Sequence, residues 1–369
     1  MSRIVLATLD AGGNVPPVLG IGAALLRQGH EVFVIGHPAQ RSAVEASGLA
    51  FTGYTSARAW SPTADKSTLR GLLELVAVFN DRGIARDVVG LVRHVAADVA
   101  GIDCMLLGAL AAAQDADIRT VSLFHTFHAF FDGSWRRGPV GVLSALTGHR
   151  AGHLWRACDR SLILSLRELD PAPTDAINHV LVWTGPVVDG VPACGPTRPR
   201  VLVSLSTTAF PGMAQTLQRI IDALGTLAVD MVVTTGPSID PGSVSAPTNA
   251  VVQRYVDHAA LMPTCSAVVG HGGHATTLRA LAHDLPLLVI PAHPMLDQKM
   301  VGQAVARAGA GLVLTRKATT QEIRNSVQTL LHTPTYRSAA ASLGLRIRAS
   351  RGAETAAEHI AVTASATPF

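Results

Sequence analysis

A glycine-rich stretch in the second half of the chain has the composition of an anion-binding turn. It runs from Gly270 to Thr277 and reads GHGGHATT. A short β-branched run, residues 267–269, precedes it, and an apolar helical pattern follows it. Glycines let a ligand approach the backbone closely, and the unpaired N–H groups at a helix start attract anions. The stretch matches neither GxGxxG nor the P-loop pattern. It predicts a phosphate site that works without a metal.

Two polar features accompany this turn. His271 follows the strand directly, so as a donor or as a cation it could take charge from a leaving diphosphate; the alternative is a purely structural histidine. Asp297 and Gln298 follow the next apolar run, residues 287–290. A carboxylate accepts hydrogen bonds and a carboxamide both donates and accepts, so this pair could grip two neighbouring hydroxyls of a sugar. The alternative is an ordinary surface dipeptide.

An aromatic cluster stands out in the first half of the chain. Residues 124–135 hold four Phe, one Trp and two His, although aromatic residues are only 4% of the sequence. One interpretation is core packing. The other is one wall of an apolar acceptor pocket, formed by Phe127, His128, Phe131 and Trp135.

Two similar layouts must position these groups. The first is a strand at residues 3–8, a Gly-rich turn, a helix from Val18 to Gln28 and a strand from Glu31 to Ile35. The second is a strand at residues 201–205, a helix from Thr216 to Leu227 and a strand from Val229 to Thr235. Each layout begins a βαβ unit, so each half is expected to build a parallel sheet covered by helices. The Pro- and Gly-dense segment 185–199 between them is the predicted linker.

Composition narrows the function classes. The chain has 369 residues with 48% hydrophobic and 15% charged, which suits two ordinary domains. The net charge of +4 comes from scattered residues without interleaved aromatics, so no nucleic-acid partner is expected. No apolar run is long enough to span a bilayer, and the N-terminus lacks signal-peptide features, so we expect a cytoplasmic protein without a membrane span. The four cysteines match no zinc spacing and are expected to be buried, reduced thiols.

Residues 265–311 resemble the donor signature of family 1 glycosyltransferases, especially actinobacterial enzymes that decorate natural products. The matching run is His271-Gly272-Gly273, Thr276-Thr277, Ala280-Leu281, Pro286, Pro291, Asp297-Gln298 and Gly309-Ala310-Gly311. The resemblance extends to residues 203–207 and 1–38, while residues 40–185 are the least distinctive part. It implies the GT-B fold, an α/β architecture of two doubly wound Rossmann-like domains facing a cleft. It further implies an acceptor-binding domain over 1–184, a linker over 185–199, a donor-binding domain over 200–345 and a C-terminal helix, 346–369, that packs back on the N-terminal domain.

The resemblance also implies a set of donor-binding residues. They are Ser206, Thr207, Arg254, Tyr255, Val256, His271, Gly273, Ala275, Thr276, Asp297 and Gln298. In this scheme His271 contacts the diphosphate, and backbone groups of Gly273, Ala275 and Thr276 cradle it. Residues 254–256 bracket the nucleobase. Ala275 stands where the family usually has Gly, a small change that still permits close approach of phosphate.

The proton acceptor is the unsettled part of the site. The family usually carries a His, or in some relatives an Asp, in the first Gly-rich turn, and here Asn14 occupies that position. An amide cannot accept a proton at neutral pH. Another residue could supply the base, with Asp10, His125 and His128 as candidates. Alternatively the acceptor needs little base help, or the domain binds without catalysing.

The sequence therefore predicts an inverting, metal-independent glycosyltransferase. It would move a sugar from a dTDP- or UDP-sugar, used as co-substrate with no cofactor, to a small aromatic or polyketide-like acceptor in natural-product (antibiotic) biosynthesis. The alternative is a catalytically silent auxiliary protein that binds nucleotide-sugar or activates a partner transferase. A nucleotide-sugar epimerase is disfavoured because no acid–base carboxylate pair is evident, and a lipid-linked sugar transferase would need a basic apolar patch that Trp135-Arg136-Arg137 barely supplies. The sequence is compatible with a homodimer and does not determine the oligomeric state.

Overall fold

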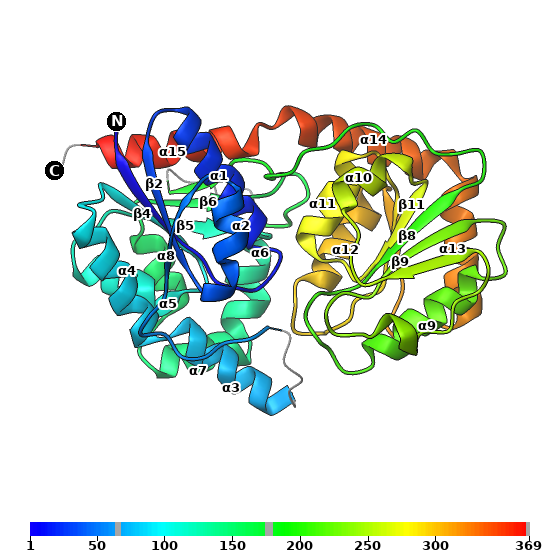
Figure 1. The fold of residues 1–369 in the computed structure, drawn as a ribbon, viewed down its shortest axis with the longest axis horizontal. Helices are drawn as coiled ribbons and strands as arrows, with labels where there is room; N and C mark the ends of the chain where they lie inside the picture. Colours follow the sequence, from blue (N-terminus) through cyan, green and yellow to red (C-terminus); the bar gives the residue numbers. More distant parts are fainter. Residues whose placement is uncertain (63–67, 174–179, 367–369) are drawn as a thin grey trace. The chain divides into compact units, whose positions relative to one another are not determined.

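The computed structural model describes residues 1–62, 68–173 and 180–366, which form two compact units. Unit 1 comprises Met1–Pro62, the described part of Lys66–Val187 and the residues from Arg351 onward. Unit 2 comprises Val188–Ser350. Each unit is built on one parallel sheet with helices around it (Figure 1).

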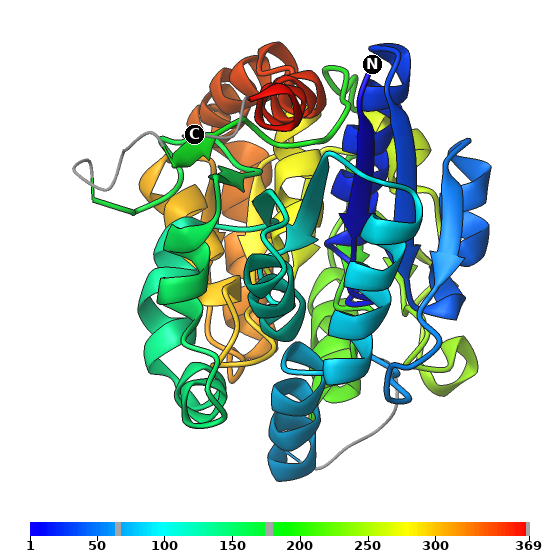
Figure 2. The ribbon, with the colours of Figure 1, turned by 90° about the vertical axis from the view of Figure 1, so that its left-hand side faces the viewer.

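The sheet of unit 1 has seven strands in the order β3-β2-β1-β4-β5-β6-β7. The strands are β1 (Arg3–Ala7), β2 (Glu31–Gly36), β3 (Ala50–Gly53), β4 (Val99–Asp103), β5 (Thr120–Phe124), β6 (Arg160–Ile163) and β7 (Leu181–Trp183). The α-helices are α1 (Val15–Arg27), α2 (Arg41–Ala46), α3 (Thr68–Phe79), α4 (Arg82–His94), α5 (Leu107–Asp115), α6 (His128–Phe130), α7 (Pro139–Leu146), α8 (Ala151–Ala157) and α15 (Gly352–Ser365). A 3₁₀ turn, η1 (Pro38–Gln40), and a π-helical turn, η2 (Phe131–Trp135), complete the unit. Figure 2 looks onto the side of unit 1 that carries α4.

The sheet of unit 2 has six strands in the order β10-β9-β8-β11-β12-β13. The strands are β8 (Arg200–Ser204), β9 (Asp230–Thr234), β10 (Ala250–Gln253), β11 (Ala267–Gly270), β12 (Leu287–Val289) and β13 (Gly311–Val313). The helices are α9 (Met213–Leu224), α10 (His258–Leu261), α11 (His274–Ala282), α12 (Gln298–Arg307), α13 (Thr320–His332) and α14 (Pro334–Ala349), with the short turns η4 (Pro241–Ser243) and η5 (Met262–Thr264).

Both sheets reverse their strand order at one point, between β1 and β4 in unit 1 and between β8 and β11 in unit 2. Every strand pair among the described residues is parallel, so the carboxyl ends of neighbouring strands meet at the same edge. In open parallel sheets, ligands bind outside this edge at the point of reversal. The order therefore marks two places where loop residues from different strands come together.

The helices begin earlier than the sequence pattern predicts. α1 starts at Val15 rather than Val18, and α9 starts at Met213 rather than Thr216. For α1 the reason is that Pro16 and Pro17 occupy its first positions, where a missing N–H costs nothing and the fixed φ suits a helix. The predicted strands are displaced by one residue or less at either end.

The C-terminal residues form two helices that belong to different units. α14 packs against α11 in unit 2, and α15 packs against α1 in unit 1 (Figure 1). The helical conformation is interrupted between them at Arg351, which has a φ of 49°. Ala356, Ala357 and Ile360 of α15 are fully buried in the hydrophobic core of unit 1. α15 thus completes this core.

Two composition-based expectations can be compared with the structure. All four cysteines are free, and three are buried, but Cys194 is exposed because it lies in the irregular segment before β8. The expectation of a buried Cys194 was wrong. Among the described residues, no helix combines the length and the apolar character that crossing a bilayer requires.

Candidate active site

The predicted donor residues of unit 2 cluster at the point where its sheet reverses. Loops leave the carboxyl ends of β8, β11 and β12, which are adjacent strands. The loop after β8 carries Ser206 and Thr207, the loop after β11 carries His271, and the loop after β12 carries Asp297. Ser206 and Asp297, which are 91 positions apart in the sequence, therefore follow two strands that both pair with β11.

The turn after β11 is shaped by its glycines. Gly272 has a φ of 84°, and a Cβ atom there would lie 2.6 Å from the carbonyl oxygen of Gln298. Both facts require glycine at this position. α11 then begins at His274, with Gly273 as its N-cap and without a side-chain cap. Because glycine has no side chain that could cap the helix, no side-chain cap covers the N–H groups of Ala275 and Thr276, as anion binding at a helix start requires.

His271 is held as a neutral imidazole. Burial lowers its pKa to about 4, and the backbone of Ser204 offsets only part of that shift. Its Nδ1 atom is buried and has no hydrogen-bond partner among the residues that the structure describes. Of the two predicted modes, donor or cation, the structure therefore favours a neutral donor.

The two members of the acid–amide pair differ in their surroundings. Gln298 is 2% exposed, and its Oε1 accepts hydrogen bonds from the backbone N–H groups of Ala292 and His293 at 2.7 and 3.0 Å. The amide oxygen thus holds the loop after β12, and only its Nε2 side is left for a ligand. Asp297 is partly exposed and precedes the first turn of α12.

The remaining predicted donor residues lie on the β8 and β10 side of the same sheet. Ser206 is buried, and its Oγ accepts from the N–H of Thr208 at 3.0 Å, whereas Thr207 is exposed. Arg254 donates to Asp240 at 3.3 Å, and Tyr255 is 79% exposed. An exposed aromatic ring beside a strand end suits stacking on a base.

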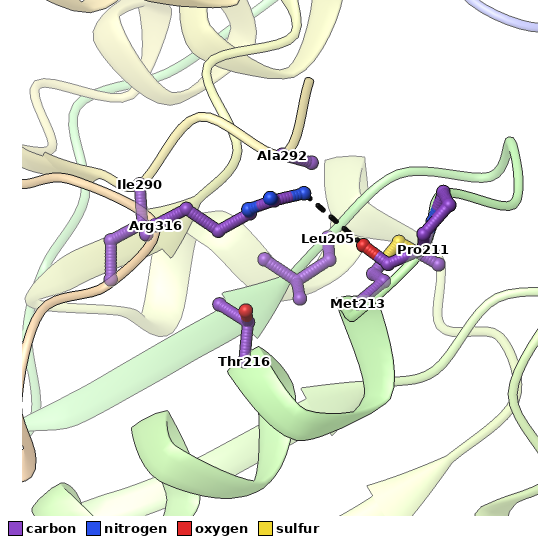
Figure 3. Close-up of a pocket in the computed structure, with 7 residues that line it drawn as sticks. All are labelled: Leu205, Pro211, Met213, Thr216, Ile290, Ala292 and Arg316. Atoms are coloured by element: carbon purple, nitrogen blue, oxygen red, sulfur yellow. Dashed lines mark hydrogen bonds between the residues drawn. The ribbon is translucent and has the colours of Figure 1, made fainter. Parts of the chain in front are cut away.

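A small pocket adjoins this edge of unit 2 (Figure 3). It is lined by Leu205, Pro211, Met213, Thr216, Ile290, Ala292 and Arg316. Arg316 donates through Nη1 to the carbonyl oxygen of Pro211 at 3.3 Å, as the dashed line in Figure 3 shows. The rings of Phe210 and His293 lie 5.3 Å apart. These contacts tie the loops after β8, β12 and β13 together.

At the reversal point of unit 1, Asn14 contacts a residue that the sequence reasoning missed. Asn14 is 2% exposed and does not cap α1 with its side chain. Its Nδ2 donates to the carbonyl oxygen of Leu9 at 2.9 Å and to Oδ2 of Asp103 at 2.6 Å. Asp103 is the last residue of β4 and is also 2% exposed. A carboxylate that ends an apolar buried strand was the signal that could have identified it.

His125 approaches the same carboxylate from the next strand. It follows β5, and its Nδ1 lies 3.7 Å from Oδ2 of Asp103. The structure thus brings Asn14 and His125, both predicted from the sequence, to one oxygen atom.

The ligand atoms of Asp103, Cys104 and His125 lie within 4.8 Å of one another, a spacing that could hold a metal ion. Cys104 is fully buried, and this burial, reinforced by the Asp103 charge, raises the pKa of its thiol well above the usual range.

Asp10 lies in the loop after β1. Partial burial raises the pKa of its carboxyl group, as a proton acceptor working near neutral pH would need. Its backbone is anchored on both sides, because its N–H donates to Nδ1 of His37 at 3.4 Å and its carbonyl accepts from Trp60 at 2.6 Å. No described interaction fixes its carboxylate, unlike that of Asp103.

The aromatic cluster is largely interior. Phe127, Phe131 and Trp135 are 1%, 1% and 7% exposed, and the Phe131 ring packs against Trp135 and Trp155 at 5.8 and 5.9 Å. This burial favours the core-packing interpretation for the three rings. His128 is only partly buried, and its ring lies 6.1 Å from that of Trp183. Acceptor contact for these four residues stays a prediction, with His128 the most accessible.

Comparisons with known proteins agree on one group of enzymes. Residues 218–361 match the model of the erythromycin biosynthesis protein CIII-like C-terminal domain. The chain is 25% identical to 4'-demethylrebeccamycin synthase of Lentzea aerocolonigenes, over 93% of this chain and 94% of that protein. It is 36% identical to tylactone mycaminosyltransferase of Streptomyces fradiae over a shorter stretch, 32% of this chain and 26% of that protein.

Solved structures extend the similarity to the fold of the whole chain. The calicheamicin glycosyltransferase CalG4 matches with a TM-score of 0.80 at 20% identity, covering 100% of both chains. The glycosyltransferase VinC in complex with dTDP matches with a TM-score of 0.72 at 19% identity, covering 98% of this chain and 99% of that one. The predicted GT-B architecture is confirmed by these matches together with the two parallel sheets.

Proposed function

Because the chain belongs to the family 1 glycosyltransferases of natural-product biosynthesis, we propose that it transfers a sugar from a dTDP- or UDP-sugar to a small aromatic or polyketide-like acceptor. Glycosyl transfer itself follows from the family. The donor nucleotide, the acceptor class, inversion at the anomeric carbon and independence of a metal are our proposals.

The observation that carries the proposal is the turn between β11 and α11. An uncapped helix start, a glycine with positive φ and a neutral His271 lie within five residues, from 270 to 274. Backbone N–H groups and a neutral imidazole donor stabilise diphosphate oxygens without adding a counter-ion. This is the arrangement expected where negative charge grows on a leaving nucleoside diphosphate and no metal takes part.

The donor sugar and nucleobase have separate positions in this proposal. Asp297 accepts hydrogen bonds from the sugar hydroxyls and Gln298 donates through Nε2, since its Oε1 is already engaged. Residues 254–256 bracket the base, with exposed Tyr255 as the stacking surface. Thr207 offers its exposed hydroxyl to the diphosphate, while buried Ser206 shapes the turn that presents it.

Isothermal titration calorimetry with dTDP and UDP tests the proposal. His271→Ala is expected to weaken binding of the preferred nucleotide at least 10-fold, and EDTA is expected to leave the wild-type affinity unchanged. His332→Ala is the matched control, because His332 is exposed on α13 of the same unit. Equal affinity of wild type and His271→Ala would disprove the diphosphate assignment, and loss of binding in EDTA would disprove metal independence.

A further inference from the structure

The pair Asp103–His125 is placed by the strand order of unit 1. β4 and β5 are adjacent and parallel, and Asp103 pairs in register with Leu123. His125, two residues further along β5's direction, therefore emerges beside the Asp103 carboxylate at the carboxyl edge of the sheet. The Asp103 side chain is 2% exposed and that of His125 is 19% exposed. The carboxylate is thus interior, and the imidazole has one side open.

Hydrogen bonds to residues other than His125 hold both oxygens of the Asp103 carboxylate. Its Oδ1 accepts from the N–H of Met105 at 2.9 Å, and its Oδ2 accepts from Nδ2 of Asn14 at 2.6 Å. Asn14 is itself anchored to the carbonyl oxygen of Leu9 at 2.9 Å. The Nδ1 atom of His125 is buried and has no hydrogen-bond partner among the described residues. Among the described residues, the carboxylate oxygen within ion-pair distance of this nitrogen is Oδ2 of Asp103, at 3.7 Å.

We propose that His125 accepts the proton of the acceptor hydroxyl, that Asp103 is its positioning residue, and that Asn14 holds the Asp103 carboxylate in place. The inference rests on the proposed transfer reaction. It assigns Asn14 a structural role at the position where the family has its base. The base is instead His125, which follows β5.

The transfer step balances as follows. The acceptor O–H proton passes to Nε2 of His125, while the oxygen lone pair forms the new bond to the anomeric carbon. The bond from that carbon to the diphosphate oxygen breaks, and its electron pair leaves with the nucleoside diphosphate. The imidazolium so formed points Nδ1–H at the Asp103 carboxylate, which stabilises it. The two atoms are 3.7 Å apart and not hydrogen-bonded in this structure, and the proposal requires the distance to shorten to about 2.8 Å when the acceptor binds, as catalytic hydrogen bonds often do.

The proposal fixes the tautomer of His125, which can be read without any substrate. Because the nitrogen that faces a carboxylate carries the proton, Nδ1 is expected to be protonated and Nε2 to hold the lone pair. Long-range ¹H–¹⁵N NMR at pH 8 should report this tautomer in the wild type. In Asp103→Asn the preference should be lost. A wild-type His125 with its proton on Nε2 overturns the proposal.

Kinetics supply the second test, using whichever donor of a dTDP- and UDP-sugar panel gives the highest wild-type turnover. His125→Gln is expected to lower kcat at least 100-fold with an unchanged donor KM, and Asp103→Asn to lower it about 10- to 100-fold. The fall in kcat caused by His125→Gln should be smaller with 2-chloro-4-nitrophenol as acceptor than with an aliphatic alcohol. The acidic phenol loses its proton more readily and depends less on a general base. Retained turnover in His125→Gln, or abolished turnover in Asp10→Asn alone, overturns the assignment.

A rescue variant separates positioning from folding. Nδ2 of Asn14 and Nδ1 of His125 both face Oδ2 of Asp103, so a histidine at position 14 could use the same carboxylate. Asn14→His combined with His125→Gln should regain at least 10-fold in kcat over His125→Gln. If Asn14→His does not fold, the tautomer measurement still decides. Calorimetry with dTDP and UDP keeps the two proposals apart, because His125 variants should bind nucleotide normally.

Discussion

Gly273 and His271 are so close that a side chain at position 273 would collide with the His271 ring where it now lies. A Cβ atom on Gly273 would lie 2.5 Å from Nε2 of the His271 imidazole, far inside contact distance. The φ of Gly273 is −62°, so its backbone conformation is one that any residue adopts. Glycine is needed there for the space that the imidazole fills.

Gly273→Ala is therefore expected to displace the His271 ring while leaving the backbone of α11 intact. The affinity for dTDP or UDP should fall about 10-fold or more, by the loss of one hydrogen bond to a charged group. Calorimetry and circular dichroism measure the two effects. Gly90→Ala on α4, where the new methyl group meets open space, serves as the control. Normal affinity in Gly273→Ala would show that the ring position does not matter.

Acid should destabilise the protein through two buried histidines. Burial lowers the pKa of His37 and of His271 from 6.5 to about 4. Between pH 6.5 and pH 4 the unfolded state binds more protons than the folded state, so the free energy of unfolding falls as the pH falls. The stabilisation is fully present above pH 6.5, and at most about 3 kcal/mol per group is lost by pH 4.

Urea denaturation at pH 7.5, 5.5 and 4.5 measures this loss. His37→Gln should reduce the pH dependence, whereas His332→Gln, an exposed position, should leave it unchanged. Nucleotide affinity should not rise on acidification from pH 7.5 to 5.5, since His271 stays neutral. A marked rise would mean that a protonated His271 binds the diphosphate.

Gln298 should matter for the loop after β12 as well as for the sugar. Gln298→Leu leaves the N–H groups of Ala292 and His293 without their acceptor, which is expected to cost about 1–3 kcal/mol of stability. Gln298→Glu keeps an acceptor oxygen and should retain most of the stability while changing the donor KM. Urea midpoints and donor kinetics distinguish the two variants. Equal stability of Gln298→Leu and wild type would contradict the structural role of Oε1.

Local patterns were enough to predict the strand–turn–helix at 267–282, because its glycines, its apolar strand and its helix lie within 16 residues. They were not enough to predict Asp103. Asp103 and Asn14 are 89 residues apart, and only the strand order, with β4 beside β1, brings them together. Periodicity shows that a strand exists but does not show which strand is its neighbour.

The aromatic cluster illustrates a second limit. Composition indicated that residues 124–135 were unusual, and it could not tell a pocket wall from a packed interior. Residues Phe131–Trp135 form a π-helical turn, a rare conformation that the sequence pattern did not predict. Phe131, which is 1% exposed, packs against Phe124 and also against Trp155, a residue outside the segment that composition could not connect with it.

The division of the last helices between the two units has a consequence for biosynthesis. The described residues of unit 2 form one continuous stretch, Val188–Ser350, so they leave the ribosome before the residues of α15 do. The core of unit 1 stays incomplete until Ala356, Ala357 and Ile360 have been made. Part of the apolar surface of unit 1 therefore stays without its native cover while unit 2 is being made.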